Sequence, residues 1–374
     1  MNQSIFLFRL LPALITAIVI SLVAMPAIIK IASLKKLTDE PDGERKRHEH
    51  IVPTLGGIGI FASFLISFSV WGDAESLQSY PYFVAALFML FLIGVKDDIL
   101  VLSPLKKLLI QFVASAEIVI GGGVVLRNLE GLFGAHQIPW AVGVIITTLI
   151  IVIIINAYNL IDGIDGLAGG IGMIIAIITG GWFLISGFST MATLSFVLAG
   201  AIWGFLIFNF YPAKIFMGDT GAMAVGFILA YILLQFVTFN QSHPESAFHI
   251  SNALIYAVAL FIIPVVDTLR VIVLRLISGK NPLKADYNHI HHAFIKAGFS
   301  PHVAAAALWI GNLLIIGQAY YFSYLEPNIL LMLILLSGFL ILPVVNFVHF
   351  LLLKFLPDKY AEYIMKRGKK KHSW

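Results

Sequence analysis

The 374-residue sequence contains no cysteine and few charged side chains. The absence of cysteine excludes a disulfide framework, a cysteine-ligated metal and a thiol nucleophile. Charged residues make up 12% of the chain, against roughly 25% in an average soluble protein, and hydrophobic residues make up 59%. So few charges cannot cover a water-exposed surface. The composition therefore excludes a soluble globular enzyme and a disordered chain, and it predicts an integral membrane protein.

Long apolar segments predict transmembrane helices, because roughly 20 helical residues cross the hydrocarbon layer. They do not alternate with a period of two, which argues against a membrane β-barrel. The first is too long for a signal peptide and lacks a small-residue cleavage site, so we expect it to be retained. The sequence predicts an all-α, polytopic membrane bundle of about 11 transmembrane helices, at residues 6–30, 54–71, 81–96, 106–126, 139–157, 166–186, 191–209, 220–239, 250–274, 303–323 and 328–353.

Lysine and arginine indicate how these helices cross the membrane. Twenty-two of the 24 lie in alternate connections and in the C-terminal segment, and only Arg9 and Arg127 fall on the other side. Basic residues are enriched in cytoplasmic loops. We therefore expect the N-terminus outside, the C-terminus in the cytoplasm and five cytoplasmic loops. The basic tail at 354–374 favours contact with anionic membrane lipid over nucleic acid.

Acidic side chains gather in the same connections, in three places. Asp97 and Asp98 end the third predicted span, where adjacent carboxylates favour a bound cation; the alternative is a solvated helix cap. In residues 156–166, which begin with Asn156, a helix would place Asn159, Asp162 and Asp165 along one face, among glycines that let a ligand approach the backbone. The alternative is an Asp-Gly turn.

The third place is the segment 216–221, where Asp219 stands between glycines at the start of a predicted span, after Phe216. Alone, Asp219 would be read as a helix N-cap. Together, however, the three places offer five carboxylates on one membrane face. Mg²⁺ binds few carboxylates and completes its shell with substrate phosphate oxygens. The sequence therefore predicts a divalent-cation site that acts on a phosphorylated substrate.

Two basic segments are candidates for contact with that phosphate. His289, His291 and His292 follow Lys284 in the longest cytoplasmic loop. A regular helix would place His289 and His292 on one face and turn His291 away, so contact with phosphate by imidazolium is favoured over zinc, while a structural cluster stays open. Residues 45–48 precede Gly56–Gly57 and form either a cationic collecting loop or simple flanking charge, with the glycines allowing close backbone packing.

A transporter is the rival from another functional class. It would need ionisable residues along a path through the membrane, and only Glu117, Asp267 and Arg270 lie within predicted spans. Asp267 and Arg270 are expected to form a salt bridge on one helix, and Glu117 has no evident partner. Because the other acids gather at the membrane boundary, an enzyme is favoured.

Taken together, these motifs resemble the polyprenyl-phosphate N-acetylhexosamine-1-phosphate transferase superfamily, glycosyltransferase family 4, over essentially the whole chain. The His-x-His-His form at 289–292 is similar to the branch that transfers GlcNAc-1-phosphate to undecaprenyl phosphate. The sibling branch, which transfers phospho-MurNAc-pentapeptide in peptidoglycan synthesis, shows three consecutive histidines. Tyr287 stands where family members often have arginine, so Lys284 would take over its phosphate contact.

The resemblance implies a reaction in which polyprenyl phosphate attacks the β-phosphorus of UDP-GlcNAc or a related UDP-N-acetylhexosamine and releases UMP. This is the first membrane step of a cell-surface polysaccharide pathway. The implied cofactor is Mg²⁺, or Mn²⁺. The implied enzyme is a multi-pass protein of the plasma (inner) membrane and a homodimer. Its active site would lie on the cytoplasmic face, in a catalytic transmembrane domain at 1–353, and it would have no nucleic-acid partner.

The resemblance also assigns residue roles. The metal ligands would be Asp219 and Asp98, and the catalytic residues Asp97, Asp98, Asp162, Asp165 and His291. The substrate would be bound by Lys46, His48, Asn156, Asn159, Phe216, Lys284, His289 and His292.

Overall fold

A computed structural model describes residues 3–35, 52–73, 76–279 and 289–355. These residues are helical except for connecting segments and one isolated bridge between Asn128 and Gln137. The helices are α1 (Gln3–Lys35), α2 (Gly56–Trp71), α3 (Tyr80–Leu100), α4 (Pro104–Ala116), the π-helix η2 (Glu117–Gly121), the 3₁₀ turn η3 (Leu132–Gly134), α5 (Trp140–Ile161), α6 (Leu167–Ile185), α7 (Ser189–Asn209), α8 (Gly218–Ser242), α9 (Ala253–Leu260), α10 (Ile262–Ile277), α11 (Ile290–Lys296), α12 (Pro301–Tyr321) and α13 (Pro327–Phe355).

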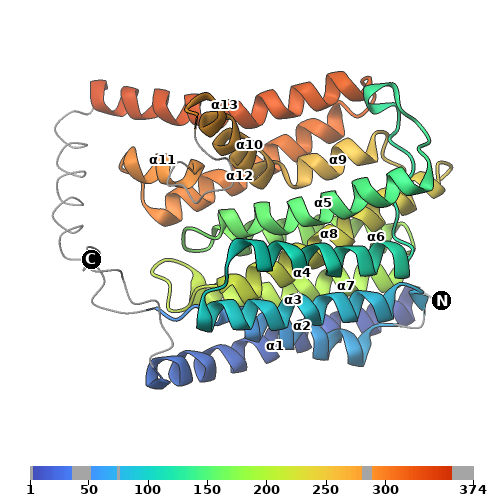
Figure 1. Cartoon of the computed structure of the whole chain (residues 1–374), viewed down its shortest axis with the longest axis horizontal. Coiled ribbons are helices and arrows are strands. Elements are labelled where there is room, and N and C mark those ends of the chain that lie inside the picture. Colours follow the sequence, from blue (N-terminus) through green and yellow to red (C-terminus); the bar gives the residue numbers. More distant parts are fainter. Residues whose placement is uncertain (1–2, 36–51, 74–75, 280–288, 356–374) are drawn as a thin grey trace.

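The long helices form a bundle in which α8 is the central element. Every residue from Thr220 to Val237 is buried, as expected of a helix that is apolar on all sides. The connections 101–103, 162–166 and 210–217 lie at one end of the bundle, on the left of Figure 1, together with the first residues of α8. The connections 122–139 and 243–252 lie at the other end. The acidic motifs therefore share one end, as the charge pattern predicts.

Helix lengths support a multi-pass membrane protein. Seven described helices are long and apolar enough to cross a membrane, or eight if the bent pair α9 and α10 is one span. All eleven predicted segments contain helix, but α2 has only 16 residues and α4 only 13. The prediction for 106–126 is also too long, since helix there ends at Gly121. Helix α13 continues past the predicted domain boundary at residue 353, to Phe355.

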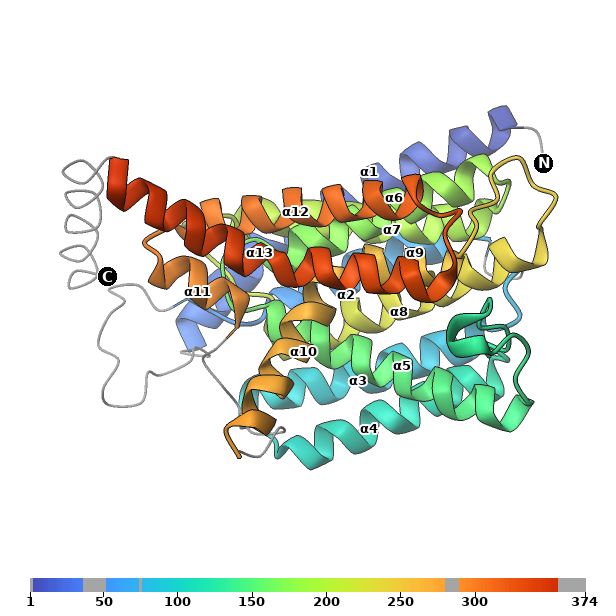
Figure 2. The same cartoon turned by 90° about the horizontal axis from the view of Figure 1, so that it is seen from above.

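The segment 250–274, expected as one continuous span, is broken at Phe261. Helices α9 and α10 meet there at 77°, and Figure 2 shows α10 running across the direction of the neighbouring helices. Pro264 has no N–H to give to the carbonyl of Leu260, four residues earlier, so the helix cannot continue undisturbed. The Asn312 side chain on α12 donates to this carbonyl at 3.2 Å. The break is thus satisfied by a neighbouring helix, as a membrane interior requires.

Close packing of glycines brings α2 and α3 against the start of α8. A Cβ at Gly57 would lie 2.0 Å from the backbone nitrogen of Gly221, and one at Gly94 would lie 2.5 Å from the Cα of Thr220. The expectation that Gly56–Gly57 allows close backbone packing is confirmed. This contact sets the position of the α8 N-terminus, around which the acidic motifs lie.

Candidate active site

Asp98 closes the N-terminus of α8. Its Oδ1 accepts the backbone N–H of Asp219 at 2.8 Å, and its Oδ2 accepts the N–H of Thr220 at 3.0 Å as well as the Thr220 hydroxyl. The first N–H groups of a helix lack partners within the helix and carry partial positive charge, so a carboxylate stabilises them. The cap that Asp219, considered alone, would be expected to provide is therefore supplied by Asp98 on α3. This leaves the Asp219 side chain available for other contacts.

Asp219 lies at the centre of a group of polar side chains from four helices. Its Oδ1 accepts the side-chain amide of Asn159 on α5 at 2.7 Å and lies 3.2 Å from the Lys107 ammonium on α4. Lys107 also contacts the carboxylate of Asp97, which is 5% exposed and accepts the backbone N–H of Leu102. One lysine thus bridges Asp97 and Asp219. Two of the three acidic motifs, distant in sequence, meet here.

Asp162 brings the third acidic motif to the same place. It forms a hydrogen bond with the backbone of Gly218, directly before Asp219. Burial raises the pKa of Asp162 well above its usual range, and the negative charges of Asp219 and Asp98 raise it further. A carboxylate held near two others without a compensating cation resists ionisation. The site therefore has an excess of negative charge that a cation would relieve.

Asp165 has a different contact from the other acids. Its Oδ2 accepts the backbone N–H of Ala213 at 2.9 Å, in the connection between α7 and α8. Asn209 reinforces that contact, because its side chain accepts the Gly166 N–H at 2.9 Å and donates to the Ile215 carbonyl at 2.9 Å. Asp165 and Asn209 thus hold two connections of the site together. The catalytic role assigned to Asp165 stays a prediction.

The three histidines gather beside Asp162, in an arrangement that differs from the expected one. His289 precedes α11 in extended backbone, so it shares no helical face with His292. The rings of His289 and His291 lie 5.6 Å apart and parallel within 3°, and those of His291 and His292 lie 4.3 Å apart. The expectation that His291 points away from the other two is therefore wrong. His291 also packs on the backbone of Gly163, where a Cβ would lie 2.4 Å from its Nε2.

Burial also changes the protonation expected of these histidines. It lowers the pKa of His291 to about 3, with a further contribution from His292, and it lowers the pKa of His292 as well. His291 is 2% exposed and its Nδ1 has no hydrogen-bond partner among the described residues. The ring of His291 is accordingly neutral at pH 7. This differs from the imidazolium that the sequence suggested.

Phe216 and the segment after Pro53 pair through their backbones. The Phe216 N–H donates to the Pro53 carbonyl at 2.8 Å, and its own carbonyl accepts the Gly56 N–H at 3.0 Å. The Phe216 side chain is half-buried. The segment that contains Pro53 and Gly56–Gly57 is therefore joined to the α8 N-terminus as well. The described residues do not include Lys46 and His48, which precede this segment in the sequence. They also do not include Lys284 and Tyr287 of the other basic segment.

Asn156 lies one turn before Asn159 on α5, and its side chain contacts both α4 and its own helix. Its side-chain amide donates to Gln111 on α4 and to the carbonyl of Val152. Gln111 in turn donates to the sulfur of Met223 on α8. Asn156 therefore ties α4, α5 and α8 together beneath the acidic group, and its predicted contact with substrate stays a prediction.

The oxygen atoms that these side chains offer fit a hard divalent cation whose coordination shell is completed by substrate. In the described part of the chain, no three acidic or imidazole side chains form a metal site by themselves. Asp97, Asp98 and Asp219 nevertheless supply three carboxylates against one described lysine partner, Lys107. Carboxylate and amide oxygens suit Mg²⁺, which usually keeps one or two carboxylates and takes its other ligands from water and phosphate. These residues are thus consistent with a metal held jointly with a diphosphate.

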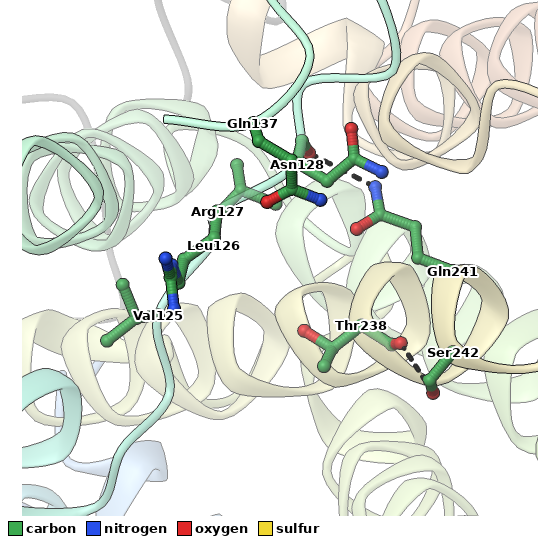
Figure 3. A pocket seen from close by; sticks show the side chains of 8 residues that line it. All are labelled: Val125, Leu126, Arg127, Asn128, Gln137, Thr238, Gln241 and Ser242. Carbon is green, nitrogen blue, oxygen red and sulfur yellow. Dashed lines mark hydrogen bonds between the residues drawn. The ribbon is translucent and has the colours of Figure 1, made fainter. Parts of the chain in front are cut away.

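A pocket lies at the opposite end of α8 from the acidic group. This pocket of about 250 Å³ is lined by the end of α8 and by residues of the 122–139 connection, and Figure 3 shows Thr238, Gln241 and Ser242 facing Arg127, Asn128 and Gln137. At 1.5 Å per residue, the length of α8 separates it from Asp219 by roughly 30 Å. The pocket therefore belongs to the other face of the molecule.

Sequence reasoning gave no site role to Lys107 and overlooked Asn209. The available signal was helical spacing: Lys107 shares a face with Gln111, Ala114 and Ser115, all of which are buried. Asn209 had no such signal, because a single amide near a helix end is ordinary.

Comparison with known proteins agrees with these motifs. A family model described as glycosyl transferase family 4 matches residues 80–237. An undecaprenyl-phosphate alpha-N-acetylglucosaminyl 1-phosphate transferase of Escherichia coli K12 is 30% identical, with 83% of this chain and 84% of the relative covered. A probable undecaprenyl-phosphate N-acetylglucosaminyl 1-phosphate transferase of Bacillus subtilis is 31% identical, over 81% and 82%. A decaprenyl-phosphate N-acetylglucosaminephosphotransferase of Mycolicibacterium smegmatis is 32% identical, over 71% and 72%.

Proposed function

The chain belongs to glycosyl transferase family 4, and from that premise we propose that it transfers N-acetylglucosamine-1-phosphate from UDP-GlcNAc to a polyprenyl phosphate and releases UMP. The relatives' names support this acceptor and this sugar. The His-x-His-His form at 289–292 favours it over transfer of phospho-MurNAc-pentapeptide. A transporter is disfavoured, because the acids gather at one end of the bundle.

One observation carries the proposal: residues 218–220 at the start of α8 contact Asp98, Asp162 and, through Asp219, both Asn159 and Lys107. Phosphoryl transfer requires mainly positioning of the phosphates and neutralisation of their charge. Mg²⁺ or Mn²⁺ bound at Asp219 and Asp98 would supply that neutralisation. Both substrates are anions, so the lysine and arginine residues of the predicted cytoplasmic connections would attract them.

The protein's own residues then have distinct tasks. Asp98 holds the α8 N-terminus, and Lys107 bridges Asp97 and Asp219. The acceptor phosphate needs no dedicated base, because a phosphate monoester has its second pKa near 6 and is mostly dianionic at pH 7. The neutral ring of His291 suits a hydrogen bond to sugar or phosphate rather than charge neutralisation.

The reaction is tested with purified protein in detergent. UMP release should require UDP-GlcNAc, polyprenyl phosphate and divalent metal together, and the lipid product should carry GlcNAc-diphosphate by mass spectrometry. UDP-GalNAc and UDP-MurNAc-pentapeptide supplied in parallel decide the sugar. Turnover with UDP-MurNAc-pentapeptide alone would move the chain to the sibling activity. Ion flux in proteoliposomes without UMP release would favour the transporter.

We further propose eleven spans in the plasma (inner) membrane, with the N-terminus outside and the site facing the cytoplasm. The lysine and arginine distribution supports this orientation. Because the chain has no cysteine, single cysteines report location cleanly. Ser246→Cys should react with a membrane-impermeant maleimide on intact cells, whereas Ser103→Cys should react only after permeabilisation. The reverse pattern would invert the topology. The homodimer stays a prediction.

A further inference from the structure

A buried acid outside the group around Asp219 contacts the histidine cluster. Asp267 on α10 is 1% exposed, and both of its oxygens are directed to the start of α11. Its Oδ2 lies 2.9 Å from Nδ1 of His289, and its Oδ1 accepts the backbone N–H of Ile290 at 2.7 Å. A buried carboxylate is costly unless such donors satisfy it. Each oxygen of Asp267 therefore has its own partner at the start of α11, a pairing that the sequence did not indicate.

We infer that Asp267 is a positioning residue that fixes the tautomer and orientation of His289. Two contacts define the orientation of the Asp267 carboxylate. Its Oδ1 accepts the backbone N–H of Ile290, which can only donate, so its Oδ2 faces the imidazole of His289. A carboxylate accepts the Nδ1 proton and leaves Nε2 with its lone pair, the arrangement by which a buried acid orients a histidine. Without Asp267, His289 could present either ring nitrogen.

The effect reaches the site through ring packing. The ring of His289 lies parallel to that of His291, and His291 packs on Gly163, adjacent to Asp162. The carboxylate that holds His289 is carried by α10 just after the bend at Phe261. The broken span thus places an acid where it can orient the histidine cluster. The inference rests on the proposed function in one respect, namely that His289 meets the sugar diphosphate.

Asp267→Asn is the decisive variant because it keeps the shape and changes one hydrogen bond. The amide oxygen must still accept the Ile290 N–H, since two facing donors would repel. Its NH₂ then faces Nδ1 of His289, which must become an acceptor and move the proton to Nε2. Histidine ¹⁵N–¹H NMR at pH 8 reports this directly: Nδ1 protonated in the native protein and Nε2 protonated in the variant.

Activity and rescue complete the test. We expect Asp267→Asn to lower kcat/KM for UDP-GlcNAc by about 100-fold, as other wrong-tautomer and outer-shell changes do, with an unchanged melting temperature. Asp267→Glu restores a carboxylate and should recover the native tautomer and part of the activity. Thr268→Val, in the same turn, removes a buried hydroxyl that has no described partner and should leave both readouts unchanged.

Several outcomes overturn the inference. These are a native tautomer in Asp267→Asn, a switched tautomer with full activity, or an equal loss in Thr268→Val. A native protein that releases no UMP would instead contradict the proposed function. The tautomer comparison is independent of turnover, so it would still decide whether Asp267 fixes His289.

Discussion

Lys107 provides a quantitative test of the electrostatics of the site, by the change Lys107→Met, which keeps the length of the side chain and removes its charge. The ammonium lies 3.2 Å from Asp219 Oδ1, and its side chain is 23% exposed. At an effective dielectric constant of about 20, opposite unit charges at this separation attract by about 5 kcal/mol. Screening by solvent at a partly exposed lysine leaves roughly half, about 2–3 kcal/mol.

At 1.4 kcal/mol per factor of ten, that energy predicts a fall in kcat/KM of about 30- to 150-fold for Lys107→Met. The Mg²⁺ concentration for half-maximal rate should fall as well, because the carboxylates lose the lysine that partly neutralises them. UMP release measured across a Mg²⁺ titration gives both quantities. Lys106→Met is the matched control, since Lys106 is exposed, and it should behave like the native protein. Native kcat/KM in Lys107→Met, or an equal loss in Lys106→Met, would refute the reasoning.

Two further predictions concern stability. Gly57→Ala places a Cβ 2.0 Å from the Gly221 nitrogen and should lower the free energy of unfolding by about 1–3 kcal/mol; Gly181→Ala, with nothing within 4 Å, should not lower the melting temperature, and equal effects would contradict the packing. Folding lowers the pKa of His291 from its ordinary value near 6.5 to about 3. Between pH 3 and pH 6.5 the unfolded chain therefore binds more protons than the folded protein. Stability should therefore fall by about 1.4 kcal/mol per pH unit below pH 6.5, and thermal unfolding of His291→Gln should lose this dependence; an unchanged pH profile would count against it.

The sequence predicts the all-helical bundle and the shared end of the acidic motifs well, because both depend on composition and charge placement. It fails at α9 and α10, where a single proline sits within a continuously apolar segment. Proline in a span can kink or break the helix, and only a neighbour such as Asn312, which satisfies the freed carbonyl, allows the 77° bend. That neighbour is distant in sequence.

The site shows the same division. The residue types and spacing predict that Asp98, Asp162 and Asp219 belong to one site, and the structure brings them together, but the contacts of each depend on packing between helices. Asp98 caps α8, a role that Asp219 would have been expected to take only if it were considered alone. His291 lies with the other histidines because α11 begins only after His289, and helix boundaries are the least predictable feature of a sequence.

The most direct measurement compares Asp219→Asn with Asp73→Asn, an equal change of charge at the other end of the bundle. The native protein should release UMP only with divalent metal present. Asp219→Asn should lose at least about 100-fold in turnover, the scale of removing one preorganised electrostatic group, while keeping its melting temperature, and Asp73→Asn should match the native protein. Undiminished turnover in Asp219→Asn, or native turnover in excess EDTA, would contradict the account.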